Sequence, residues 1–231
     1  MTRPFRFAVQ ARPLDDHDGL VAAARWIEAL GYDELLSYDH IGAIDPFIPL
    51  TVAALRSLLD TGAADLDGVH HQLHLGDLGI RPARARVPLL IGGHGKRVVA
   101  IAARHADIFQ FTGLTHGEGG QPTAAGFGID AVSERSRWLT ESAGDRTADI
   151  ERSALVQAID IAPDACDRLD AMAERFDVTR AVLDDTPFVL IGSVAQIVDK
   201  LQRLRDDIGI SHYVVRDPEG FAPVVEILAG H

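Results

Sequence analysis

Residues 88–111 read PLLIGGHGKRVVAIAARHADIFQF, and this stretch decides the fold. A short apolar run, residues 87–91, is typical of a buried strand, and glycines then mark a tight turn. Residues Lys96 to His105 carry apolar side chains at helical spacing, and Ala106 to Phe111 form the next strand. A strand, a turn, a helix and a second strand in succession predict two parallel strands joined by a crossover helix.

The same pattern continues on both sides of this stretch. Upstream, a strand from Phe5 to Gln10 is followed by a helix that Asp15 or Asp16 begins and Gly31 ends, and then by a strand from Tyr32 to Tyr38. Downstream, the pattern predicts a helix over residues 129–142, two helical stretches over 165–183, and helices over 193–207 and near 221–228. It predicts strands over 154–161, 188–191 and 212–215. We therefore predict one α/β domain over residues 1–231 with a mostly parallel sheet of about six strands.

The alternation fails in one place. A helix that begins near Phe47 or Pro49 runs into Leu58 and Leu59, and about residues 61–87 then show no helical period. Glycines and a proline interrupt this segment, which predicts a hairpin excursion with residues 70–75 as a strand.

The three histidines of this hairpin do not predict a metal site. Strand alternation places His70 and His74 on one face and His71 on the other, and no cysteine lies nearby. We predict a solvated hairpin and no bound metal.

Composition excludes several classes of function. The net charge of −12 argues against nucleic-acid binding, because that role needs a basic surface. No segment reaches the roughly 18 apolar residues of a membrane span, and the N-terminus lacks the apolar core of a secretory signal. The single cysteine, Cys166, cannot form an internal disulfide, which fits a reducing compartment. These features predict a cytoplasmic protein that binds neither membrane nor nucleic acid.

The turn after the strand at residues 87–91 is the strongest candidate site. Its residues are Gly92, Gly93, His94, Gly95, Lys96 and Arg97. Glycines permit close backbone approach, and two cations in the first turn of the helix supplement its free N–H groups, so the turn could hold the phosphate of a cofactor. The alternative is a tight structural turn with surface cations. A second such turn, from Leu190 to Ser193, has no cations and is interpreted as structural, with Ser193 as the helix cap.

Asp39 and His40 form the second candidate site. They follow the predicted second strand, and active sites of parallel α/β barrels lie at the carboxyl ends of the strands. A histidine beside a carboxylate suits proton transfer near neutral pH, whereas the alternative is a capping aspartate beside an exposed histidine.

Six segments together resemble the luciferase-like flavin and deazaflavin oxidoreductases, and the subgroup that uses coenzyme F420 is most similar. The segments are Phe5–Gln10, Leu30–Asp33, Ser37–His40, Pro88–Gly93, Ala102–Asp107 and Pro187–Ser193. The resemblance implies a TIM-barrel-like (β/α)8 fold, commonly dimeric. It also implies a cofactor phosphate at Gly92–Arg97 and a role for His40 beside the reacting carbon.

The chain departs from this family in its middle. The resemblance implies two further strand–helix units after the helix that begins near Phe47, and the sequence shortens at a junction near residues 55–56. We therefore expect an incomplete, rearranged or open barrel, and hypothesise that a second copy completes it in a homodimer.

Three functions follow from the resemblance. The first is hydride transfer between coenzyme F420, or a flavin, and a small organic substrate, with His40 as the acid–base group and Asp39 beside it. The second is a non-catalytic or vestigial cofactor-binding protein of the same fold. The third is an FMN-dependent monooxygenase.

Overall fold

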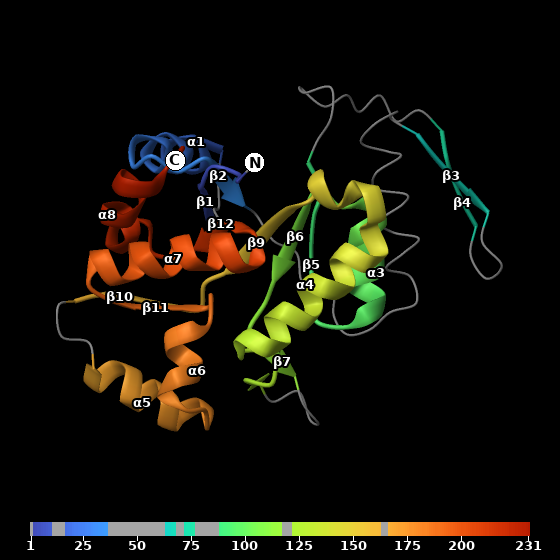
Figure 1. Cartoon of the computed structure of the whole chain (residues 1–231). Helices are drawn as coiled ribbons and strands as arrows, with labels where there is room; N and C mark the ends of the chain where they lie inside the picture. Colours follow the sequence, from blue (N-terminus) through green and yellow to red (C-terminus); the bar gives the residue numbers. More distant parts are fainter. Residues whose placement is uncertain are drawn as a thin grey trace.

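A parallel sheet of six strands forms the centre of the molecule (Figure 1). The computed structural model describes residues 2–10, 17–36, 63–67, 72–76, 88–116, 122–162 and 166–231. Across the sheet, the strands are β2 (Glu34–Leu36), β1 (Arg6–Gln10), β12 (Ile210–Val215), β9 (Glu151–Leu155), β6 (Ile108–Phe111) and β5 (Leu90–Gly92). All neighbouring pairs are parallel, as the βα alternation predicted.

The strand order is that of a barrel with one gap. The first strand of the chain, β1, pairs with the last, β12, and the order then descends through β9 and β6 to β5. Within the described residues the ring stays open between β2 and β5, which are the two edges of the sheet. The predicted incomplete barrel of about six strands is thereby confirmed.

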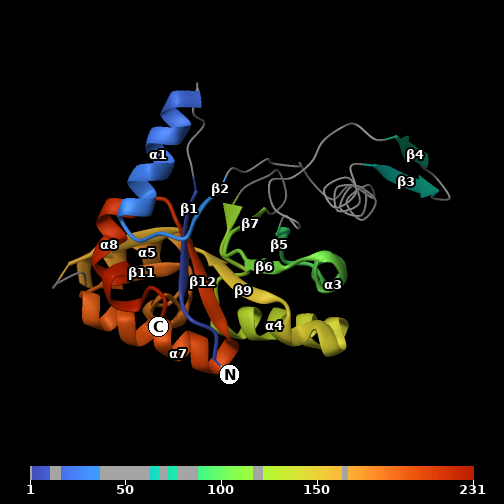
Figure 2. The same ribbon diagram turned by 90° about the horizontal axis from the view of Figure 1, so that it is seen from above.

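Amphipathic helices cover the outer face of the sheet (Figures 1 and 2). They are α1 (His17–Ala29), α3 (Lys96–His105), α4 (Ile129–Ala143), α7 (Val194–Ile208) and α8 (Pro218–Leu228). In α7 the buried residues are Ile197, Leu201 and Leu204, at the spacing of one helical face. Two further helices, α5 (Cys166–Phe176) and α6 (Arg180–Asp185), precede α7. Among the described helices, none has the length and apolar character needed to cross a membrane.

Two aspartates tie strands to the loops beside them. The Asp33 carboxylate accepts the Phe7 backbone N–H at 2.8 Å, and the Asp107 carboxylate accepts the Leu89 N–H at the same distance. Each aspartate stands between a helix and the strand that follows, so it fixes the start of that strand against its neighbour. This geometry explains why an aspartate follows Tyr32 and Ala106 in two of the segments that predicted the fold.

The predicted strand over residues 154–161 is wrong in its limits, because two strands occupy this region. The first, β9, starts earlier, at Glu151, whose carboxylate is buried and paired with Arg6 at 2.7 Å. Val156 still bonds to β12, but the Gln157 N–H donates to Phe188 O at 2.7 Å. From there β10 (Ala158–Ile161) pairs with β11 (Val189–Gly192) outside the main sheet.

The hairpin excursion is present as an antiparallel pair. It consists of β3 (Ala64–Asp67) and β4 (Gln72–Leu75), which Figure 1 shows apart from the six-stranded sheet. A second short hairpin, β7 (Thr115–His116) with β8 (Pro122–Thr123), lies between β6 and α4. The junction near residues 55–56 and the helix from Phe47 lie outside the described residues.

Candidate functional site

The carboxyl end of β5 leads into the predicted phosphate turn, and two glycines there are required by space. A Cβ on Gly93, whose φ is +157°, would lie 2.7 Å from Val98 Cγ1. A Cβ on Gly92 would lie 3.0 Å from the Gln110 carbonyl oxygen of the adjacent strand. The two glycines therefore let the backbone pass close to β6 and to the first turn of α3.

Gly95 has a different role, because a Cβ there would meet open space. It is the N-cap of α3, with φ −83° and ψ 149°, and it is exposed and provides no side-chain cap. The first intrahelical bond runs from the Val99 N–H to Gly95 O at 3.0 Å. The amides of the first turn thus have no side-chain acceptor in the described part of the chain, which leaves them available to an anion.

Lys96 and Arg97 flank these amides. Both side chains are exposed, and the Lys96 ammonium lies 5.0 Å from the centre of the Trp138 ring on α4. Arg97 forms no ion pair with any residue that the structure describes. Two exposed cations therefore lie beside the N-terminal end of the α3 dipole.

His94 does not face outward with them. Its Nδ1 accepts from Arg135 Nη1 at 2.9 Å, and its Nε2 lies 2.7 Å from Thr112 Oγ1 and 3.0 Å from Leu114 O. These partners assign the proton to Nε2, because Arg135 can only donate. Burial, followed by the Arg135 charge, lowers the pKa of His94 to about 4, so the ring is neutral at pH 7. The structure thus places the imidazole inside the loop and leaves only the His94 backbone for a ligand.

Arg135 holds this loop in place. Its guanidinium donates to Thr112 O at 2.8 Å and to Gly126 O at 2.7 Å, in addition to His94. Burial lowers its pKa to about 10, which still leaves it charged at pH 7. Sequence reasoning missed this residue, although Val132, Arg135 and Leu139 share the buried face of α4 at helical spacing.

The second strand–glycine–helix turn is occupied by its own side chains. Ser193 Oγ accepts the Gln196 N–H at 3.3 Å, and Gln196 Oε1 accepts the Ser193 N–H at 2.8 Å. This capping box satisfies the first amides of α7 and confirms the structural interpretation of that turn. The two turns therefore differ in whether side chains cap the first amides of the helix, although their sequences begin alike.

A polar network lines the inner face of the sheet, on the side away from the helices. Arg6 pairs with Glu34 and Glu151, while the Gln110 side chain donates to Ser153 Oγ at 3.4 Å. His212 Nδ1 lies 2.9 Å from Ser153 Oγ, and its Nε2 lies 3.6 Å from Glu34. Burial, then the Arg6 charge, lowers the pKa of His212 to about 3. A neutral histidine thus lies within a partly buried network of charged and polar side chains from several strands. The sequence pattern of single strands did not predict this network.

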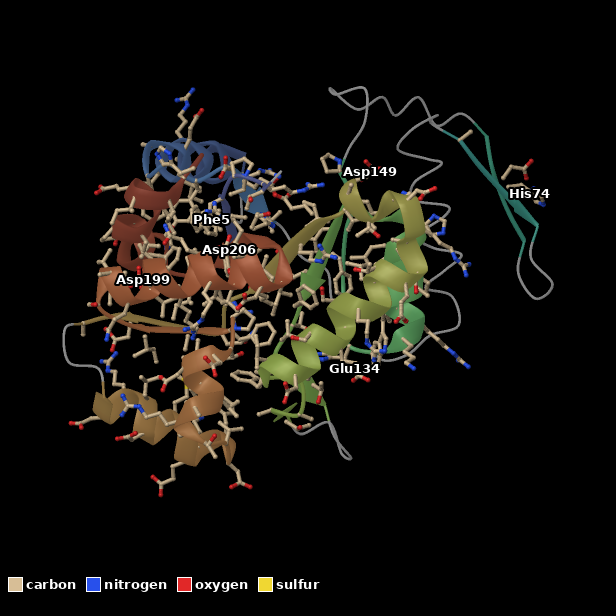
Figure 3. All side chains as sticks on the ribbon, in the orientation of Figure 1. Phe5, His74, Glu134, Asp149, Asp199 and Asp206 are labelled. Carbon is tan, nitrogen blue, oxygen red and sulfur yellow. The ribbon has the colours of Figure 1, made fainter. Side chains whose placement is uncertain are left out.

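The other residues that the sequence singled out are Asp39, His40 and the three histidines of the hairpin. Asp39, His40, His70 and His71 lie outside the described residues. His74 is exposed on β4 and pairs with Asp65 of β3, far from the sheet (Figure 3). Within the described ranges, no cluster of histidine, cysteine and acidic residues has the arrangement of a metal site.

Comparison with solved structures places this geometry in a known fold. The coenzyme F420-dependent tetrahydromethanopterin reductase from Methanopyrus kandleri matches with a TM-score of 0.64 and 12% identity, over 96% of this chain and 97% of the reductase. An F420-dependent secondary alcohol dehydrogenase, solved with an F420-acetone adduct, matches with a TM-score of 0.58 and 12% identity, over 96% and 97% of the two chains.

A monooxygenase from Streptomyces bottropensis matches with a TM-score of 0.57 and 12% identity, over 98% of each chain. No protein-family profile and no curated protein sequence matches the chain. At this identity the likeness concerns the fold. The chain has the luciferase-like fold shared by these F420-dependent enzymes and this monooxygenase, as its sequence motifs predicted.

Proposed function

We propose that the protein is an oxidoreductase that binds coenzyme F420, or a flavin in its place, and transfers a hydride to or from a small organic substrate. The observation that carries this proposal is the uncapped N-terminus of α3 at the carboxyl end of β5. Solved proteins of the same fold include two that depend on F420.

The residues present fit a cofactor phosphate. Free amides of the first turn, an exposed Gly95 without a Cβ, and the cations Lys96 and Arg97 together supply charge and hydrogen bonds to an anion. We assign the cofactor-binding role to Gly92, Gly93, His94, Gly95, Lys96 and Arg97, with His94 contributing its backbone. The bound deazaflavin or flavin would supply the hydride chemistry, while the protein binds and orients it.

His40 and Asp39 are proposed as the acid–base residues. They follow the segment that contains β2, whose carboxyl end is on the same side of the parallel sheet as the end of β5. A neutral His40 would move a proton at the substrate oxygen, and Asp39 would orient its ring.

Cofactor titration tests the phosphate assignment. We expect coenzyme F420 to bind the purified protein. Lys96→Ala/Arg97→Ala should weaken binding about tenfold or more, because the phosphate loses two positively charged partners. Fluorescence of the deazaflavin measures the affinity. Arg175→Ala/Arg203→Ala removes the same charge from other exposed positions and should leave it unchanged. Equal affinities for the two double variants would refute the assignment.

Two alternatives stay open to the same titration. The six-stranded sheet with open edges favours a cofactor-binding protein without turnover, which tight binding without reduction of any electron acceptor would reveal. The likeness to a monooxygenase favours the second alternative, FMN-dependent oxygenation, which FMN binding with oxygen consumption would reveal.

A further inference from the structure

A cavity of about 770 Å³ lies at the other end of the sheet from the α3 turn. Its walls come from segments that lead into strands: residues 2–3 before β1, residues 144–150 before β9, and Gly209 before β12. Because the sheet is parallel, these segments lie at the amino ends of the strands, whereas the α3 turn follows a carboxyl end. In Figure 2 the N-terminus marks this end, beside α7.

Three arginines line the cavity. Arg3 comes from the N-terminal segment, Arg152 from β9 and Arg205 from the last turn of α7. Each donates to one protein oxygen: Arg3 to Ala148 O, Arg152 to Thr140 Oγ1 at 2.9 Å, and Arg205 to His231 O at 2.7 Å. A guanidinium carries five N–H donors, so most of this donor capacity is uncommitted to protein atoms.

Two of these three arginines lack an acidic partner. Other arginines, such as Arg168 and Arg203, pair with carboxylates, whereas Arg3 and Arg152 have no carboxylate partner within 4 Å among the described residues. Arg205 differs, because its partner oxygen belongs to the terminal carboxylate of His231. Burial, followed by the charge of Arg3, lowers the pKa of Arg152. Asp145 and Asp206 also line the cavity, so its walls carry three arginines and two aspartates in a chain of net charge −12.

Two of the guanidinium groups are held in position before any ligand arrives. Arg205 stacks on Phe5, 4.1 Å from the ring centre, and Arg152 packs on Gly209, where a Cβ would lie 3.0 Å from Nη1. The Nε atoms of both arginines are buried without a hydrogen-bond acceptor. A buried donor without a partner is destabilising, so a ligand that supplied an acceptor there would stabilise the fold.

We propose that this cavity is a second binding site, which takes a phosphorylated small molecule through Arg3, Arg152 and Arg205. Planar guanidinium forks match the oxygens of a phosphoryl group, and the volume suits a ligand larger than inorganic phosphate alone. The site is independent of the proposed cofactor turn, because it shares no residue with it and lies at the opposite ends of the strands. Figure 3 labels Phe5 and Asp206, which mark this region.

Pyrophosphate is the probe, and Lys96→Ala/Arg97→Ala is the background, so that the turn at α3 does not contribute. Isothermal titration calorimetry at constant ionic strength should show one site, with Arg3→Gln and Arg152→Gln each weakening binding about tenfold. Asp206 lines the same cavity, so Asp206→Asn should tighten binding by removing a repelling carboxylate. Gain of affinity in that variant cannot arise from misfolding.

Matched controls complete the test. Arg137→Gln and Glu226→Gln make the same changes of charge on exposed positions outside the cavity and should leave the affinity unchanged. Absence of binding at up to about 10 mM pyrophosphate would overturn the proposal. So would an affinity that Arg3→Gln and Asp206→Asn do not alter, and tighter binding of citrate than of pyrophosphate would overturn the ligand class.

Discussion

Arg135 is the residue on which the loop beneath the α3 turn depends. It is 3% exposed and donates to His94 and to three carbonyl oxygens, those of Thr112, Gly126 and Ala131. Arg135→Met should lower the free energy of unfolding by about 3 kcal/mol, because it leaves buried acceptors without a donor. Urea unfolding measures this loss.

The matched variant Arg137→Met lies on the same helix, where Arg137 is exposed and pairs only with Glu134 and Glu141. Its effect should stay within about 0.5 kcal/mol. The pKa of His94 should also rise in Arg135→Met, because the charge that lowers it is removed, and NMR titration of the ring detects this. Equal stability of the two variants would contradict the role given to Arg135.

Lys200 makes stability depend on pH in the alkaline range. Its ammonium donates to Leu183 O and Val189 O, and burial lowers its pKa from 10.5 to about 7. Between these values the unfolded chain binds the extra proton, so the free energy of unfolding should rise with pH from about 7 to about 10.

Denaturant unfolding across this range tests that expectation. In Lys200→Met the rise should be smaller than in the parent protein, whatever the absolute stability of the variant. Parallel pH profiles for the two proteins would show that Lys200 does not carry this dependence.

At the scale of elements, a carboxylate added at the N-terminus of α3 tests whether a cofactor phosphate binds there. Gly95 has an extended backbone with ordinary φ and open space at its Cβ, so Gly95→Asp fits without strain. The carboxylate should cap the helix and keep or slightly raise stability, while abolishing binding of a cofactor phosphate by occupying its amides.

Gly95→Ala is the control, because it adds a Cβ without an acceptor or a charge. Thermal unfolding and F420 titration separate the two effects. Unchanged F420 affinity in Gly95→Asp would show that the phosphate does not lie at this helix end.

The sequence pattern predicted an element correctly where the limits of that element depend on its own residues. The helix predicted over Lys96–His105 has those limits in the structure, because glycines precede it and an apolar face runs along it. Long-range pairs were not predictable in the same way. The start of β9 was not predicted, because a charged residue such as Glu151 is not typical of a buried strand. Its burial depends on the ion pair with Arg6, which is 145 residues away.

The same contrast between local and long-range determinants applies to the candidate site. The glycines and cations of the turn were visible in the sequence, because they are consecutive. The direction of His94 was not, because Thr112, Leu114 and Arg135 come from later segments and decide it together. Sequence therefore predicted where the site lies better than which atoms face a ligand.

At the scale of the whole molecule, the two sheet edges have consequences for assembly. The edge strands β2 and β5 are only three residues long, which limits but does not remove their capacity to pair with another chain. We propose that two copies associate, which light scattering would show as twice 24.9 kDa. A monomer with its full helical content would contradict this proposal.

The ends of the chain meet beside the sheet. The Phe5 N–H donates to His231 O at 3.0 Å, and the Gly230 N–H donates to Phe5 O at 3.1 Å. Figure 2 shows the N- and C-termini side by side. A short linker between the two termini would therefore join them without moving the strands of the sheet. New termini could be opened in the β3–β4 hairpin. The order in which the strands leave the ribosome is thus separable from their order in the sheet.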